Sequence, residues 1–114
     1  MSQFSQLIAR NAFSQLLLLH GETVTYRPKV GGSYERNAIV ERNPPAMFDP
    51  AGNVVAPSAM VSFHNDATIG VDPVTLNTGG DRVDIALRNG AKPTTRSVFQ
   101  VISTDGGVTV LAIR

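Results

Sequence analysis

The sequence predicts a mainly β protein, built as a small closed β-barrel or sandwich of about six to seven antiparallel strands, with an N-terminal α-helix and one long proline-rich loop. The first observation behind this prediction is the C-terminal run 80–114, which has the pattern of three consecutive strands joined by short polar turns. The second is composition, since 10 glycines, 7 prolines and 17% charged residues are typical of a β-rich fold with long loops. Because a three-stranded meander cannot bury both of its faces alone, we expect the earlier strands to close over it.

Length and composition also limit the class of protein. A chain of 114 residues has room for one domain, and we expect a helix in residues 1–21 followed by a β-barrel domain in residues 22–114. The chain has no cysteine, which excludes disulfides, thiolate nucleophiles and zinc–thiolate sites and is compatible with assembly in a reducing cytoplasm. Its longest apolar run, 16–19, is far shorter than the roughly 20 residues that span a bilayer. The net charge of +1 is too small to indicate a nucleic-acid partner.

The N-terminal residues 2–20 have helical spacing, and Gly21 is placed to end the helix. Phe13, Leu17 and Leu18 extend the apolar surface beyond the main stripe. Two arrangements therefore stay open: the helix lies across the open end of the barrel, or one face packs there while Phe13 and Leu17 dock on a neighbour. The main apolar stripe consists of Phe4, Leu7, Ile8, Ala12, Leu16 and Leu19.

The next segments predict the strands that precede the meander. Residues 23–27 and 37–41 alternate apolar and polar side chains and are expected to pair with each other, with Pro28 ending the first of them. Residues 58–63 are predicted as a third strand. Between this strand and the meander, residues 67–78 are expected to hold a short helical turn or an edge strand.

Residues 42–58 are predicted as one long loop, because this stretch contains four prolines and few residues that favour strands. It nevertheless carries the apolar residues Met47, Phe48, Val54 and Val55, which a solvated linker would not need. Either they fold back onto their own domain as a separate cluster, or they dock on a neighbouring subunit.

The sequence predicts no catalytic, metal or cofactor site. The only histidines, His20 and His64, stand outside any motif that would activate a nucleophile. Although Asp66 lies close to His64, no further ligand follows at metal-binding spacing. The glycine pair 31–32 lacks the spacing of a phosphate-binding loop.

Eight of the ten basic residues are arginines, whose planar guanidinium suits bidentate contacts to carboxylates or phosphates. Asp81 and Asp84 are three positions apart in the sequence, which is an odd number. On a strand they therefore point to opposite faces and form no catalytic pair. We expect some surface ion pairs across the strands of the meander. The charged residues that alternate there are Arg82, Arg88, Arg96 and Arg114 with Asp81, Asp84 and Asp105. The alternative is a charged rim toward other copies or DNA, with the candidates Arg42, Arg82, Arg88 and Arg96.

The order of several segments resembles the lambda-type phage head–tail joining family, which comprises head-completion or attachment proteins. The resemblance covers nearly the whole chain and is carried by its weak motifs taken together. Its most telling portions are Gly80-Asp81-Arg82-Val83, Thr95-Arg96-Ser97-Val98 and Asp105-Gly106-Gly107-Val108. The segments that match are VTYRP, NAIVE, the proline-rich loop, AMVSFHND, GDRVDI, TTRSVFQV and STDGGVTVLAIR.

The resemblance implies a small β-barrel that forms a ring, a hexamer, at the virion neck after assembly in the host cytoplasm. Such a head–tail connector or stopper sits between the portal or its adaptor and the tail terminator, retains the packaged DNA without reading its sequence, and provides the tail attachment site. It implies no enzyme activity, cofactor or membrane. The loop 42–58 is then the interaction or gating element, with Met47 and Phe48 as anchors, and the helix is a docking element.

Three other functions are alternatives to the head–tail connector. The first is a tail terminator or tail-completion ring of the same machine. The second is a nucleic-acid-binding module resembling an OB-fold, for which the chain offers few stacking aromatics, having only the tyrosines Tyr26 and Tyr34 and no tryptophan. The third is an enzyme, which the lack of a convergent acid–base set disfavours.

Overall fold

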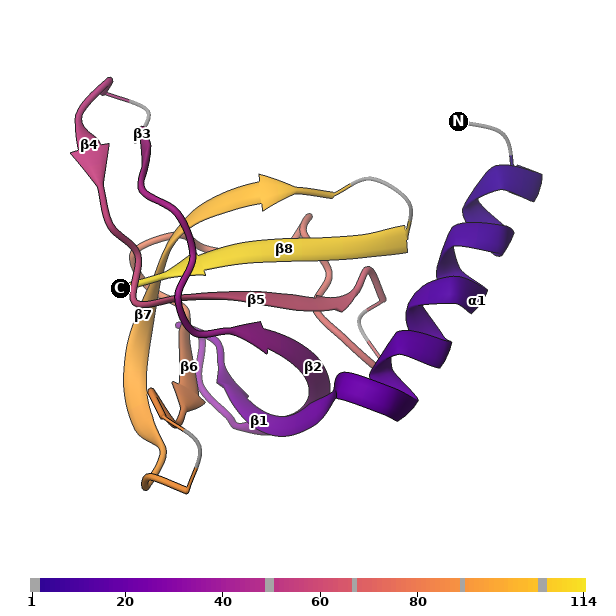
Figure 1. Cartoon of the computed structure of the whole chain (residues 1–114), viewed down its shortest axis with the longest axis horizontal. Helices are drawn as coiled ribbons and strands as arrows, with labels where there is room; N and C mark the ends of the chain where they lie inside the picture. Colours follow the sequence, from indigo (N-terminus) through magenta and orange to yellow (C-terminus); the bar gives the residue numbers. More distant parts are fainter. Residues whose placement is uncertain (1–2, 49–50, 67, 89, 105–106) are drawn as a thin grey trace.

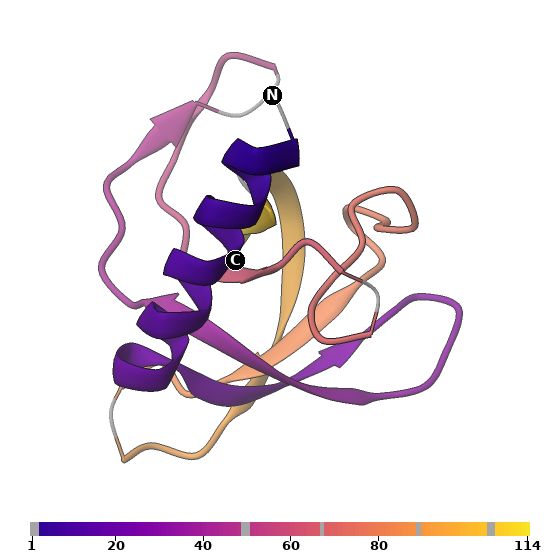
Figure 2. The ribbon, with the colours of Figure 1, turned by 90° about the vertical axis from the view of Figure 1, so that its right-hand side faces the viewer.

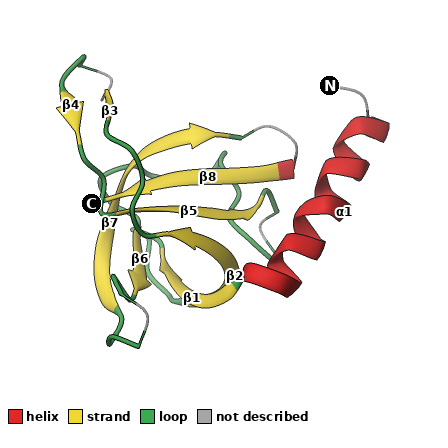
Figure 3. Cartoon of the chain, in the orientation of Figure 1, coloured by secondary structure: helices red, strands yellow, loops and turns green. Residues whose placement is uncertain are grey.

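One helix is followed by a series of short strands in the computed structural model, which describes residues 3–48, 51–66, 68–88, 90–104 and 107–114, with helix side chains described from Ala12 onward (Figures 1 and 3). The elements are α1 (Gln3–His20), β1 (Glu22–Arg27), β2 (Tyr34–Glu41), β3 (Met47–Phe48), β4 (Val54–Val55), β5 (Ala59–His64), β6 (Arg82–Ile85), β7 (Thr94–Ser103) and β8 (Val108–Ile113).

Six of the strands form a closed antiparallel barrel in the order β1-β2-β5-β8-β7-β6. The barrel closes where β1 meets β6, through the pairs Thr25 with Asp84, Tyr26 with Val83 and Arg27 with Arg82. The predicted C-terminal meander is confirmed, because β6, β7 and β8 are consecutive neighbours in this order. The mainly β class, the closed barrel and the N-terminal helix are confirmed as well. Closure gives each of these six strands a neighbouring strand on both sides.

The prediction that residues 42–58 form one irregular loop is partly wrong, because this segment contains the hairpin β3–β4. Met47 pairs with Val55, and Phe48 pairs with Val54. The β-branched valines favour extended backbone, and Gly52 supplies a φ of 88° between the strands, a value that side chains with a Cβ rarely adopt. In 67–78 the described residues 68–78 contain no edge strand and form turns, bends and irregular backbone. One of these turns is closed by a hydrogen bond from the Thr75 N–H to the Asp72 carbonyl at 3.3 Å.

The core lies inside the barrel and follows the two-residue period of the strands. Along β5, Val61 and Phe63 are fully buried, and Leu111 and Ile113 of β8 lie inside with them. Burying each such side chain contributes about 1.5–3 kcal/mol relative to leaving it in water. The remaining fully buried core side chains of large volume are Val83, Ile85 and Val98.

A buried carboxylate, Asp81, lies directly before β6, where it is only 2% exposed. The hydroxyl of Tyr26 donates a hydrogen bond to it, as do the backbone N–H groups of Lys29 (2.9 Å) and Asn77 (3.0 Å). Such donors are what a buried carboxylate requires. Burial, reinforced by Asp81, raises the pKa of the Tyr26 hydroxyl, which therefore stays protonated and continues to donate. Asp81 is therefore not part of a surface ion pair, which corrects the prediction for this residue.

Asp84 does form an ion pair, but its partner comes from β1 and not from the meander. Arg27 contacts Asp84 Oδ2 through Nε at 2.9 Å and through Nη2 at 2.8 Å. The Thr95 hydroxyl donates to the other carboxylate oxygen at 2.6 Å. These contacts lower the pKa of Asp84, and the hydrogen bond from Arg27 has the largest effect. The guanidinium of Arg114 instead lies over the Phe99 ring, 4.7 Å from its centroid, and Asp105 lies outside the described residues.

Replacing Tyr26 with phenylalanine tests the buried carboxylate. Tyr26→Phe is expected to lower the free energy of unfolding by about 1–3 kcal/mol, because Asp81 loses a donor in a buried site. Urea unfolding followed by circular dichroism measures the change. Tyr34→Phe is the matched control, since the Tyr34 side chain is exposed. Equal stability of the two variants would show that the Tyr26 hydroxyl contributes nothing to holding Asp81.

Candidate functional site

The two histidines lie in different environments. His64 is buried at the end of β5, and its Nε2 lies 3.2 Å from the Ser14 hydroxyl of α1. His20 is exposed at the end of α1. Among the described residues, no group of three or more His, Cys, Asp or Glu side chains is arranged to hold a metal ion. In the same residues, no helix has both the length and the apolar character needed to cross a membrane.

The helix α1 contacts the barrel through Phe13. Its side chain is 5% exposed, and its ring meets the His64 ring edge to face, with centroids 4.9 Å apart. Leu17 lies one turn further on the same side and is half-buried. Phe13 is thus an internal contact rather than the partner-facing residue that the sequence suggested. Figure 2 shows α1 lying across one side of the barrel.

In the described part of α1, from Ala12 onward, large apolar side chains lie on the outward side, which reverses part of the sequence-based orientation. Leu18 is 86% exposed, and Leu16 and Leu19, predicted to face the barrel, are exposed too. The reversal arises because the bulky Phe13 and the long-range contact of Ser14 with His64 set the rotation of the helix, and helical spacing alone could not distinguish the two sides. We call Leu16, Leu18 and Leu19 the helix patch.

The second exposed apolar surface is on the β3–β4 hairpin, which with its flanking residues 43–57 we call the arm. Phe48 and Val54 stand opposite each other in the register, so they share one face of the hairpin, and each is 68% exposed. Met47 and Val55 share the other face and are half-buried. The arm projects from the barrel on the side away from α1 (Figures 1 and 2). The four apolar residues singled out in the sequence are therefore brought together here.

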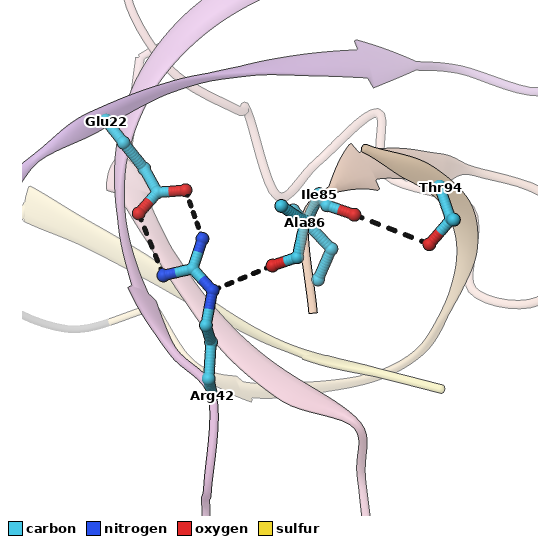
Figure 4. Close-up of polar contacts among 5 residues, drawn as sticks. All are labelled: Glu22, Arg42, Ile85, Ala86 and Thr94. Atoms are coloured by element: carbon cyan, nitrogen blue, oxygen red, sulfur yellow. Dashed lines mark hydrogen bonds and ion pairs between the residues drawn. The ribbon is translucent and has the colours of Figure 1, made fainter. Parts of the chain in front are cut away.

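The base of the arm is fixed by Arg42 (Figure 4). Its Nε donates to the carbonyl oxygen of Ala86 at 2.7 Å, and its two terminal nitrogens contact the Glu22 carboxylate at 2.9 and 2.5 Å. The hydrogen bond from Arg42 to Glu22 raises the pKa of Arg42, so the guanidinium stays protonated. On the other side of the arm, the N–H of Ser58 donates to the carbonyl of Ile113 at 2.8 Å. The structure therefore places Arg42 in an intramolecular clamp and not on a free rim.

The other three candidate arginines lie on or beside β6 and β7. Arg82 is exposed on β6, opposite Arg27 of β1. Arg88 is exposed in the segment that follows β6. Arg96 is half-buried on β7, and its Nε donates to the Thr94 hydroxyl at 3.1 Å. Arg82 and Arg88 are thus the candidates whose side chains are open to a polyanion or a neighbouring copy.

The clamp at the base of the arm can be tested with a substitution that keeps the charge. Arg42→Lys is expected to lower the free energy of unfolding by about 1–2 kcal/mol, because lysine cannot form the bidentate contact and reach Ala86 together. Amide hydrogen exchange in residues 43–57 should become faster. Arg82→Lys, on an exposed position of β6, should change stability by less than about 0.5 kcal/mol. Unchanged exchange in the arm would contradict the role of the clamp.

Comparison with known proteins assigns this chain to no family. No protein-family model matches the sequence, and no curated protein matches it.

Proposed function

We propose that this chain is a structural virion protein of the phage neck, a head–tail connector or stopper that forms a ring. The observation that carries the proposal is the pair of exposed apolar surfaces, the arm and the helix patch, on opposite sides of a closed barrel. Large apolar side chains grouped on a surface usually mark a protein contact. The resemblance to head–tail joining proteins supplies the biological context.

The barrel favours association through these surfaces and not through its strands. Each of its six strands already has a neighbouring strand on both sides. Addition of a further strand is therefore disfavoured, and we expect a neighbour to contact the projections. Two different surfaces on opposite sides of one copy produce heterologous contacts, which generate a closed ring when the rotation between copies closes. The expected ring is a hexamer, following the resemblance.

In this proposal, the ring completes the DNA-filled head, retains the genome and provides the tail attachment site. Its neighbours are the portal or adaptor protein on the head side and the tail terminator on the tail side. Packaged DNA passes through the channel, where the exposed Arg82 and Arg88 are suited to phosphate contacts that do not depend on sequence. The place of action is the virion neck, after assembly in the host cytoplasm.

A tail terminator or tail-completion ring is the alternative that uses the same two surfaces. The location of the ring in a virion distinguishes these functions. An OB-like nucleic-acid-binding module has less support, because such modules stack bases on exposed aromatic side chains of the barrel strands. Here Tyr26 is buried, and Tyr34 lies beneath the Arg36 guanidinium, which is 5.2 Å from its ring centroid. An enzyme remains the third alternative.

Self-association through the arm is tested by placing a charge on it. Phe48→Asp is expected to prevent assembly and to leave a monomer near the chain mass of 12.2 kDa, because a buried unpaired carboxylate strongly disfavours the contact. Light scattering after size-exclusion chromatography measures the mass, and urea unfolding confirms the fold. Val30→Asp is the control, since Val30 is 96% exposed on the turn after β1. Wild-type mass for Phe48→Asp would exclude the arm from self-association.

Removal of the arm tests the function in the phage. Deleting residues 46–55 is expected to leave the barrel folded, because the hairpin forms a separate two-stranded sheet outside it. Infectious particles should not assemble, because the ring loses one of its two contact surfaces. Particle yield in a complementation assay measures the effect, and the purified variant's circular dichroism spectrum checks its fold. Normal particle yield would reject this role for the arm.

A further inference from the structure

A hollow of about 350 Å³ lies between the C-terminal half of α1 and the barrel. Its apolar walls are formed by Leu17 and Leu18 of α1 and by Ile69 from the segment after β5, and both Leu18 and Ile69 are exposed. Ser14 and His64, which are hydrogen-bonded to each other, also line it. The hollow therefore offers apolar side chains to a ligand from outside. The described residues that line it are Ser14, Leu17, Leu18, Asn37, His64 and Ile69.

Among the described residues that line this hollow, none is an acidic residue, a lysine or an arginine. Two other hollows on the described surface do contain charged groups. One is lined in part by Arg36, Asp72 and Asp81, and another by Glu35 and Arg36. An apolar group that enters the hollow beside α1 costs less desolvation energy than at the other two hollows, because it covers no described acid, lysine or arginine side chain there.

The arm has the matching chemistry. Between residues 43 and 57, the sequence has one charged residue, Asp49, which lies outside the described residues. The exposed face of the arm carries Phe48 and Val54. A two-stranded hairpin of this size is at best marginally stable in water without further packing. Contact of this face with an apolar surface would supply that packing.

The hollow is lined in part by α1, and α1 and the arm lie on opposite sides of the barrel (Figures 1 and 2). The arm therefore cannot reach the hollow of its own chain. We propose that Phe48 and Val54 of one copy dock in the hollow between α1 and the barrel of the next copy. This inference rests on the proposed ring and specifies the contact that builds it. Each copy donates one arm and receives another, so the contact is heterologous and repeats around the ring.

The proposed contact also assigns a role to the helix patch. Leu18 belongs both to the patch and to the lining of the hollow, so an arriving Phe48 would cover it. The helix would then be held from two sides, by its own Phe13 on the barrel and by the neighbour's arm. Docking should therefore slow amide exchange in α1 as well as in the arm.

Cysteine crosslinking tests the contact directly, because the natural chain has no cysteine. A Phe48→Cys chain is mixed with a Leu18→Cys chain under mild oxidation, and the mixed disulfide is followed on non-reducing gels and by mass spectrometry. Docked residues share a high effective concentration, so this disulfide should form at least about tenfold faster than random encounter allows. A mixture of Phe48→Cys with Val30→Cys gives the random rate, since Val30 is highly exposed and outside the hollow.

Equal rates for the two mixtures would overturn the proposed contact. So would a predominant disulfide between two Phe48→Cys chains, which would indicate a symmetric pairing of arms. The wild-type chain could have the mass of a ring while the two cysteine mixtures crosslink at equal rates. That result would reject this contact but leave the proposed ring intact. A monomeric wild-type chain with no preferred crosslink rejects both.

As a second measurement, Ile69→Asp should reduce self-association as much as Phe48→Asp does, because both place a carboxylate in the same contact. Ile69 is exposed in the single chain, so this change leaves the barrel core untouched. Retention of wild-type mass by Ile69→Asp would also overturn the contact.

Discussion

The barrel depends on a short seam between β1 and β6, where only three residue pairs close the cylinder. Polar groups fix this seam at both ends. At one end, the buried Asp81 carboxylate accepts hydrogen bonds from Tyr26 and from the backbone of Lys29. At the other end, Arg42 links Glu22, the first residue of β1, to Ala86, which follows β6. A ladder this short would open easily without such contacts, because few backbone hydrogen bonds hold it.

The same contacts join the fold to its exposed surfaces. Arg42 directly follows β2 and stands where the arm leaves the barrel, so the clamp that secures the seam also sets the direction of the arm. On the other side of the molecule, the Phe13 contact with His64 and the Ser14 hydrogen bond fix α1 to the end of β5. The exposed apolar side chains on the arm and α1 are therefore held by the rigid barrel. Surfaces fixed in this way lose less conformational entropy when they bind.

Much of the fold could be predicted from local patterns, whereas the site could not. Alternation of apolar residues and the placement of turns predicted the meander and the closed barrel, because strand periodicity is a local property. The roles of Arg42 and Asp81 depended on partners 44 and 55 residues away, Ala86 and Tyr26, which no local pattern reveals. The rotation of α1 was missed for the same reason. The apolar residues of the arm could be identified from the sequence, because a solvated proline-rich loop does not need them.

Energetics explain why such surfaces would act in a ring and not in a pair. Burying one aromatic and one or two aliphatic side chains contributes a few kcal/mol, whereas bringing two free proteins together costs an estimated 4–15 kcal/mol. One arm in one hollow would therefore hold two copies weakly. In a closed ring every copy makes two such contacts, and the last contact forms between subunits already held close together, so its effective concentration is high. Single copies would stay soluble at low concentration, and the complete ring would be the first stable assembly.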